Sequence, residues 1–338
     1  MDCGLIIKSS GPQTGSGSST RFKSFFPVET SAFIERDSSG RLKNVKFVVT
    51  GATGLIGGAT ARHLKDAGHE VLAVDIKDGE VGAGIQLKVG DLTDLDFCDS
   101  VIAGADYVAH LGAIPNPTDS RQFNVFKNNS VSTFAVFTAA AQAKVKTVVY
   151  ASSLSAYGIA YSEKWTSPKY VPMDEAHPFI YEESYALSKE VNEKSAIMWS
   201  RRCDATFIGM RFPWVNLPDK TLELAKRFAF EDTLPPDPRF PKGIVAKILW
   251  CHLDLRDAVK AIEIAAINKP GIKGAHAFNF AAPDIISNRP ILELMKEFHP
   301  TSEIRGGLKD FEAPYSSEAF IKTFGFKPEH LFDRSALN

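Results

Sequence analysis

A tyrosine and a lysine, Tyr185 and Lys189, form the pair of side chains in this sequence best suited to proton transfer. Residues four apart share one face of a helix, and the pattern from 185 to about Ser200 predicts a helix. A free tyrosine titrates near pH 10, and a nearby ammonium group stabilises the phenolate and lowers that pKa. The spacing therefore predicts a tyrosine that takes or gives a proton at neutral pH.

A serine-rich segment precedes this pair. Residues 146–151 are predicted as a strand, which delivers the sequence Ser-Ser-Leu-Ser-Ala-Tyr-Gly at 152–158. A hydroxyl there, such as that of Ser153, can hold the substrate oxygen whose proton Tyr185 exchanges. Serines at strand ends also make ordinary turns, and Tyr-x-x-x-Lys occurs by chance, so both signals depend on a nucleotide-binding motif upstream.

Such a motif lies at residues 45–64, where a β-branched run breaks into glycines and continues as a predicted helix. Gly51 permits a tight turn, Gly54 lets the backbone approach a pyrophosphate, and Gly57 lets helix and strand pack closely. The helix N-terminus offers unpaired N–H groups to an anion. The natural ligand is a dinucleotide, and a nicotinamide would supply hydride chemistry beside Tyr185.

The next predicted strand, residues 70–75, ends in Asp75, about 20 residues after the glycines. A carboxylate there accepts hydrogen bonds from the adenosine ribose and repels a 2′-phosphate, which favours NAD over NADP. Lys77 lies close enough to weaken that preference. After a third strand at 85–89, Asp91 either caps the following helix or reaches the adenine, and Thr93 or Asp94 can serve as the cap instead.

Strand and helix patterns alternate from residue 45 onward, which predicts a Rossmann-type, doubly wound α/β fold with a small C-terminal substrate lobe. We assign residues 44–212 and 250–283 to the NAD-binding domain. The lobe would take 213–249, which includes a proline-rich stretch at 234–238, and 284–338.

A fourth strand is predicted at residues 106–113. Gly112 and Ala113, at its carboxyl end, are small enough to let a cofactor lie against the backbone. His110 lies inside the apolar strand, and we expect a core residue with satisfied ring nitrogens rather than a catalytic one.

A long helix is predicted over residues 120–142. Within it, Asn129 either holds a water or a lysine by its amide or faces solvent. Further along, His252 and Asp254 have the look of a metal pair, but their i, i+2 spacing without further ligands favours capping and packing.

Composition limits the function classes. The chain has 338 residues, a formal net charge of −1 and 23% charged residues without a basic block, which predicts a small-molecule partner, with no nucleic acid and no membrane partner. No apolar run is long enough to cross a bilayer. The four cysteines are scattered without metal-ligand spacing, which fits a reducing compartment. They are Cys3, Cys98, Cys203 and Cys251.

Residues 1–43 are predicted to be a flexible N-terminal extension, because 9–20 are almost entirely Ser, Gly, Thr, Pro and Gln. Lys8, Arg21 and Lys23 leave an organelle transit peptide open, but an untargeted extension of a cytoplasmic protein is the favoured interpretation.

These motifs together resemble the extended short-chain dehydrogenase/reductases, the NAD-dependent epimerase/dehydratase family that includes UDP-galactose 4-epimerase. Its TGxxGxxG pattern matches residues 50–57, and its HLAA segment matches 110–113 with a glycine for one alanine. The resemblance implies a homodimer formed through the helices at 120–142 and 183–200. The catalytic set that it implies is Ser153, Tyr185, Lys189 and Asn129. The implied NAD-binding set is Gly51, Gly54, Leu55, Ile56, Gly57, Asp75, Asp91, Leu92, Leu111, Gly112, Ala113, Tyr185, Lys189 and Pro213. The implied substrate contacts are Ser153, Ser155, Tyr185 and Trp214, and no metal is implied.

The sequence also departs from the family pattern. Sugar dehydratases of the family carry an Asp-Glu pair after the catalytic hydroxyl, where this chain has Leu154-Ser155, so dehydration is not expected. The family's NVYGP-type segment is replaced at residues 211–216. The lobe is short and lacks a clear basic cluster for a nucleotide diphosphate, which favours a compact substrate, as in members similar to uronate dehydrogenase.

We therefore expect an NAD-dependent oxidoreductase or epimerase that acts on a secondary alcohol or ketone of a sugar-like substrate. A nucleotide-sugar epimerase with tightly held NAD stays open. A dinucleotide-binding regulator without turnover is the alternative of another class, and the intact Tyr185 and Lys189 argue against it.

Overall fold

The structure is a computed structural model that describes residues 45–118, 121–229, 244–268 and 270–337. The predicted flexible extension, the transit-peptide question and the proline-rich stretch at 234–238 all lie outside the described residues. Within them, no helix is both long and apolar enough to span a membrane.

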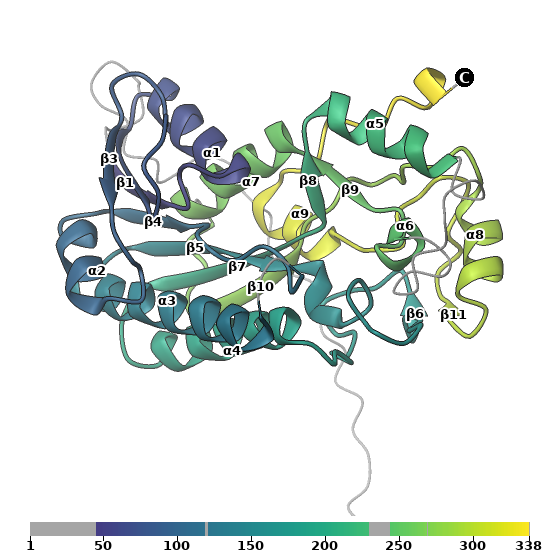
Figure 1. Cartoon of the computed structure of the whole chain (residues 1–338), viewed down its shortest axis with the longest axis horizontal. Coiled ribbons are helices and arrows are strands. Elements are labelled where there is room, and N and C mark those ends of the chain that lie inside the picture. Colours follow the sequence, from purple (N-terminus) through teal and green to yellow (C-terminus); the bar gives the residue numbers. More distant parts are fainter. Residues whose placement is uncertain (1–44, 119–120, 230–243, 269, 338) are drawn as a thin grey trace, which may run out of the picture. The chain divides into compact units, whose positions relative to one another are not determined.

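Seven parallel strands form the central sheet, in the order β10-β7-β5-β4-β1-β2-β3 (Figure 1). The strands are β1 (Lys46–Thr50), β2 (Glu70–Asp75), β3 (Gln86–Val89), β4 (Tyr107–His110), β5 (Thr147–Ser153), β7 (Thr206–Phe212) and β10 (Ala275–Asn279). The chain starts near the middle of the sheet, moves outward to β3, and then returns across β1 to build the other half. This order confirms the predicted doubly wound fold.

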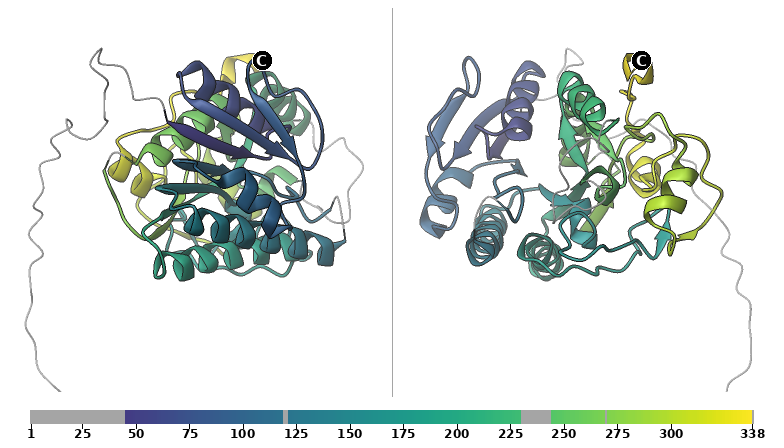
Figure 2. Two further views of the ribbon diagram at one scale, coloured as in Figure 1. Left: turned by 90° about the vertical axis from the view of Figure 1, so that its left-hand side faces the viewer. Right: turned by 45° about the vertical axis from the view of Figure 1, so that its right-hand side comes forward.

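Helices cover both faces of the sheet, and the side chains of each strand alternate between them. Phe47 and Val49 of β1 join the core beneath α1 (Leu55–Asp66) and α7 (Leu255–Ile267), whereas Val48 joins the opposite core. That opposite core lies beneath α2 (Leu95–Ile102), α3 (Gln122–Gln142) and α4 (Ser184–Ser200). Figure 2 shows the two layers of helices on either side of the strands. Successive side chains of a strand point to opposite faces, and here both faces are covered by helices. The buried strands are therefore largely apolar along their length.

A third large apolar cluster lies beyond the carboxyl side of the sheet. Residues of η1 (Leu154–Tyr157), β6 (Tyr170–Val171), α5 (Pro218–Ala229), α6 (Ile244–Lys247), α8 (Ile291–Phe298) and η3 (Arg334–Leu337) build this cluster. The other elements outside the central sheet are β8 (Trp214–Asn216) and β9 (His252–Asp254), whose Val215 and Leu253 join the core beneath α7, the exposed β11 (Glu303–Ile304), and α9 (Glu318–Phe324). Leu154, Tyr157 and Met173 pack into this cluster, although the predicted boundaries assign them to the NAD-binding domain. Conversely, Phe320 of α9 packs into the core beneath α7. The division into domains therefore stays a prediction.

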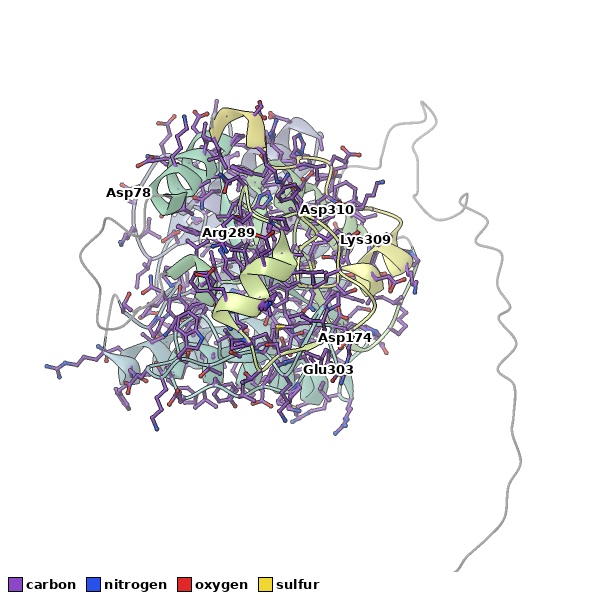
Figure 3. All side chains as sticks on the ribbon, turned by 90° about the vertical axis from the view of Figure 1, so that its right-hand side faces the viewer. Asp78, Asp174, Arg289, Glu303, Lys309 and Asp310 are labelled. Carbon is purple, nitrogen blue, oxygen red and sulfur yellow. The ribbon has the colours of Figure 1, made fainter. Side chains whose placement is uncertain are left out.

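The outer side of this lobe carries charges of both signs. Figure 3 labels Arg289 and Lys309 close to Asp310 and, lower on the same side, Asp174 and Glu303. Arg289 is paired with Glu297 at 2.6 Å. Because neighbouring charges alternate in sign, the described part of this side is not a basic surface.

Candidate functional site

The carboxyl ends of the strands bring the predicted site residues to one edge of the sheet. Thr50, at the end of β1, is in register with Val74 of β2 and His110 of β4. Ser153, at the end of β5, is in register with Phe212 of β7. The strand order reverses between β1 and β4, which is where ligands bind in open α/β sheets.

The glycine turn fits a pyrophosphate. Gly51 has φ +69°, and a Cβ on it would lie 2.7 Å from the backbone nitrogen of Gly112. A Cβ on Gly57 would lie 2.1 Å from the carbonyl oxygen of Gly51, so only glycine permits this contact between helix and turn. Gly54 is the N-cap of α1, and no side chain caps the helix. The first-turn N–H groups, including those of Leu55 and Ile56, are therefore left for an anionic ligand.

Asp75 supports the same turn from the end of β2. It is buried, and its carboxylate accepts hydrogen bonds from the backbone N–H of Thr53 at 2.9 Å and of Lys77 at 3.2 Å. A carboxylate has about four lone-pair positions. Two acceptor positions thus remain for ribose hydroxyls, and the site fits the adenosine half of a dinucleotide.

The structure settles which residue caps α2. Asp94 accepts from the backbone N–H groups of Asp96 and Phe97, at 3.0 and 3.3 Å. The Asp91 carboxylate accepts the N–H of Thr93 at 2.8 Å, and Asp91 is exposed at the same edge. Capping therefore does not require Asp91, as the sequence suggested. Its neighbour Leu92 is buried and lies 3.2 Å from the position of a Cβ on Gly112.

His110 is a core residue, which confirms the structural interpretation. Burial lowers its pKa to about 3, so the imidazole is neutral. The Thr50 hydroxyl oxygen already accepts the N–H groups of Leu111 and Gly112, at 3.1 and 3.2 Å, so its own proton goes to Nδ1 of His110 at 2.8 Å. Nε2 of His110 must then donate to the hydroxyl of Thr133 at 3.0 Å. This fixes the tautomer from the partners alone.

The same chain of hydrogen bonds reaches the helix that carries Tyr185. Asn192 of α4 donates to the Thr133 hydroxyl at 3.0 Å, and both side chains are buried. The nucleotide turn is thus joined to α4 through Thr50, His110, Thr133 and Asn192.

Ser153, Tyr185 and Lys189 meet at the end of β5. Ser153 hydrogen-bonds to the Tyr185 side chain, and its Oγ also accepts the backbone N–H of Ser155 at 3.0 Å. The Lys189 ammonium donates to the carbonyl oxygen of Ala151 at 2.8 Å and lies 5.2 Å from the centre of the Tyr185 ring. All three of these side chains are buried.

The pKa of Tyr185 differs from the expectation, because it is raised rather than lowered. Burial raises the pKa of Tyr185 above its ordinary value, and the hydrogen bond from Ser153 opposes this only in part. Burial also lowers the pKa of Lys189 to about 8, against the opposing effect of the Glu193 carboxylate. The expected lowering of the tyrosine pKa by the ammonium is absent from this arrangement, because Lys189 faces the ring and a carbonyl oxygen. Tyr185 therefore keeps its proton at neutral pH.

Two residues at this site were missed from the sequence. Glu183 caps α4, accepting from the backbone N–H of Ala186 at 2.8 Å and of Tyr185 at 2.5 Å. Its position just before the helix was the available signal. The ring of Tyr161 packs edge-on against Tyr185, with centroids 6.0 Å apart. Nothing in its spacing indicated this contact.

A buried ion pair, also missed, lies behind the serines. Arg211 of β7 donates to both oxygens of Glu193, at 2.9 and 2.7 Å, and Ser152 donates to one of them at 2.7 Å. Arg211 also donates to the Tyr157 hydroxyl at 2.7 Å. This pair holds α4 against β7 beside the reaction site, where the sequence departs from the family pattern.

In the described part of the chain, the hydrogen bonds of the Asn129 side chain do not include one to Lys189. Asn129 is buried, and its amide clamps the loop after β4, accepting the N–H of Ile114 at 2.8 Å and donating to its carbonyl at 3.0 Å. Its assignment as a catalytic residue stays a prediction.

The remaining predicted contacts follow β4 and β7. Ala113 is exposed, and Leu111 and Gly112 are half-buried. Pro213 is half-buried, and Trp214 is 40% exposed at the start of β8.

The histidine and aspartate of the apparent metal pair have separate partners. Asp254 caps α7 by accepting the N–H of Arg256 at 2.8 Å and is paired with its guanidinium. His252 bonds to Asp284 at 2.9 Å. This confirms the expectation of capping and packing.

Comparison with known proteins places these features in a family. The sequence profile described as "NAD dependent epimerase/dehydratase family" matches residues 47–228. The chain belongs to this family. The match confirms the resemblance inferred from the glycine turn and from Tyr185 with Lys189.

Among curated relatives, a UDP-glucose 4-epimerase of Streptomyces lividans is 32% identical over 154 residues, covering 43% of this chain and 44% of that protein. A GDP-mannose 3,5-epimerase 1 of Oryza sativa subsp. japonica is 30% identical over 185 residues, covering 53% and 48%. The chain thus matches less than half of the length of these relatives. A solved NAD-bound short-chain dehydrogenase/reductase superfamily protein from Agrobacterium tumefaciens superposes with a TM-score of 0.64 at 20% identity, covering 86% and 96%, which supports the fold.

Proposed function

We propose that this protein is an NAD-dependent oxidoreductase or epimerase that acts at a secondary alcohol or ketone of a sugar-like substrate. The observation that carries the proposal is the meeting of Ser153, Tyr185 and Lys189 at the sheet edge that also holds the uncapped glycine turn. A nicotinamide bound there would supply the hydride chemistry.

The protein side of the reaction is proton handling and orientation. The Ser153 hydroxyl holds the substrate oxygen, and Tyr185 exchanges the proton with it. Because burial raises its pKa, Tyr185 in the present arrangement is set to donate a proton to a carbonyl oxygen. Lys189 is held in place by the Ala151 carbonyl, and Glu193 opposes the loss of its charge.

The substrate class follows from the surroundings of this edge. Leu154 and Ser155 follow Ser153, so no carboxylate stands where a dehydratase needs one. Trp214, 40% exposed after Pro213, offers an apolar face of the kind on which a sugar ring stacks. The curated relatives that match include epimerases of nucleotide sugars. We propose a sugar or sugar acid, free or nucleotide-linked.

The test is absorbance at 340 nm with purified protein, NAD and a panel of free sugars, uronic acids, polyols and nucleotide sugars. A rise with one compound identifies a net dehydrogenase and its substrate class. If absorbance stays flat, isomer analysis of the nucleotide sugars tests for an epimerase. If neither assay gives a product although calorimetry shows that NAD binds, the proposed enzymatic function is contradicted. The alternative of a dinucleotide-binding regulator without turnover is then favoured.

Tyr185→Phe should lower turnover by at least 100-fold while NAD affinity changes less than about threefold, because only the proton-exchanging hydroxyl is removed. Tyr170→Phe is the matched control. It also removes a hydrogen-bonded tyrosine hydroxyl, which lies 2.6 Å from the Asp174 carboxylate, but on the outer side of the lobe, so turnover should persist. Equal turnover in the Tyr185 variant and the wild type would remove the assignment.

A homodimer through α3 and α4 is part of the proposal. Both helices leave large apolar side chains in solvent, with exposed fractions of 45% for Phe134 and 37% for Leu187. Phe134 also lines a cavity of about 500 Å³ with Val191 and Met198 of α4. Apolar surface that spans two helices is typical of a subunit contact.

A further inference from the structure

A cavity of about 360 Å³ lies between α4, the edge strand β10 and the segment before Phe179. Ser153, Tyr185 and Lys189 are not among its lining residues, so it is separate from the proposed reaction site. Its apolar walls come from Phe179, Ile197 and the alanines of β10. A volume of this size accommodates a small organic molecule.

The floor of the cavity includes the side chain of Tyr150. Tyr150 of β5 is 1% exposed, and no group in the described part of the chain hydrogen-bonds to its hydroxyl. Gly209 of the neighbouring strand makes room for it, since a Cβ there would lie 2.7 Å from the hydroxyl oxygen. Because Tyr150 lines the cavity and its hydroxyl makes no hydrogen bond to the described residues, this hydroxyl is available to a molecule in the cavity.

The cavity lining has an excess of negative charge. The carboxylates of Glu175, Glu190 and Glu193 face the cations of Lys194 and Arg211. Arg211 is committed to Glu193 at 2.7 Å, and Lys194 lies 3.9 Å from Glu190. Glu175 is the carboxylate left over, because no cation in the described residues lies within ion-pair distance of it. One of its oxygens accepts the backbone N–H of Asn279 at 2.8 Å.

The state of Glu175 supports the same conclusion. Burial raises the pKa of this carboxyl above its ordinary value, against the opposing effects of its backbone hydrogen bonds and of Arg211. A desolvated carboxylate without an ion pair is stabilised by any cation that enters beside it. His177, the nearest basic group along the chain, does not supply one. Its Nε2 accepts the N–H of Lys169 and its Nδ1 lies 2.9 Å from the Pro178 carbonyl, so the ring is a neutral wall.

We propose that this cavity binds a small primary amine, whose ammonium group lies between the Glu175 carboxylate and the hydroxyl oxygen of Tyr150 and whose apolar body packs against Phe179 and Ile197. An ammonium has three donors and no acceptor, so it matches two acceptors on the cavity wall. An anion would meet the excess carboxylate, and a neutral alcohol would leave it uncompensated. The site is therefore selective by charge.

The experiment uses three probes of one shape: cyclohexylamine, cyclohexanol and cyclohexanecarboxylate. Binding to the full-length protein at pH 7.5 is measured by saturation-transfer NMR with titration. The amine should bind with a millimolar dissociation constant, the range expected for a molecule of seven non-hydrogen atoms. The alcohol and the carboxylate should each bind at least fivefold more weakly. Equal binding of the amine and the alcohol, or no binding of the amine, would overturn the proposal.

Two variants locate the site. Glu175→Gln should remove the preference for amine over alcohol, and Tyr150→Phe should weaken the amine three- to tenfold. The tyrosine variant removes an unpartnered hydroxyl, so it should fold as the wild type does. Glu293→Gln, an exposed change on α8, is the matched control and should leave all three dissociation constants unchanged. Amine binding that survives both cavity variants would place it elsewhere and refute the assignment.

Discussion

Replacement of Thr50 by valine tests whether one hydroxyl organises the nucleotide-binding edge. The two side chains have nearly the same shape, so the change removes hydrogen bonds without opening a cavity. Two backbone N–H groups, of Leu111 and Gly112, lose their acceptor, and Nδ1 of His110 loses its donor. Thr50 is fully buried, so water cannot replace the hydroxyl readily.

The magnitude follows from the three groups left unpaired. Each buried group without a partner costs about 1–3 kcal/mol, with the lower end appropriate for the two half-buried N–H groups. Burying a methyl group in place of the hydroxyl returns about 1 kcal/mol. The net loss should be about 3 kcal/mol in the free energy of unfolding, which corresponds to a fall of roughly 5–10 °C in Tm for a chain of this size.

Thr60→Val is the matched control, because Thr60 is also fully buried but its hydroxyl has no hydrogen-bond partner. That variant should be neutral or more stable by about 1 kcal/mol. Urea unfolding followed by circular dichroism measures both variants. If Thr50→Val and Thr60→Val unfold at the same urea concentration, the hydroxyl does not organise this edge and the argument fails.

Three further predictions concern the cofactor, the lysine and the subunit contact. Asp75→Ala should lower the affinity for NAD roughly 10- to 100-fold in calorimetry and reduce the ratio of NAD affinity to NADP affinity, because the charged acceptors of the ribose hydroxyls are lost. The same change at the exposed Asp78 should alter neither quantity. Burial lowers the pKa of Lys189 to about 8, so between pH 8 and its ordinary value the unfolded chain binds more protons. The free energy of unfolding should then rise over that range by about 3 kcal/mol relative to Lys189→Met, and equal slopes in urea titrations would contradict the shift. Phe134→Glu should halve the mass seen by light scattering if α3 and α4 form the dimer, whereas Ile304→Glu on β11 should leave it unchanged, and a wild-type monomer would refute the contact.

The parts of the molecule that local pattern controls were predicted well. The glycine turn, the strand ending in Asp75 and the helix carrying Tyr185 lie where periodicity and turn residues indicate, because each depends on interactions within a few residues. The parallel, doubly wound sheet followed from the alternation of strand and helix, whereas the order of its strands was not predicted. The ends of the elements were predicted less accurately: β4 ends at His110 rather than at 113, and the next two backbone N–H groups bond to the Thr50 hydroxyl.

The parts that depend on distant partners were not predictable from one sequence. Glu193 and Arg211 lie 18 positions apart in the sequence, and the loop that joins their elements carries no signal that they pair. Leu154 and Met173 belong to the lobe core because the chain leaves the sheet edge after Ser153. The apolar character of a residue does not indicate which of the cores it joins. The burial that shifts the pKa of a side chain depends on this tertiary packing, so the sequence alone does not give it.

The pKa of Tyr185 shows how the difference between sequence spacing and tertiary packing affects the mechanism. Sequence spacing places an ammonium near a phenol and predicts a lowered pKa, but the spacing fixes only the face of α4 and not the direction of the ammonium. In the folded chain Lys189 donates to the Ala151 carbonyl, and burial outweighs the Ser153 hydrogen bond at the phenol. Tyr185 can therefore act as an acid in the present arrangement, whereas acting as a base requires that positive charge approach its hydroxyl. A nicotinamide in its oxidised form carries such a charge, so the direction of proton transfer should be linked to the oxidation state of the bound cofactor.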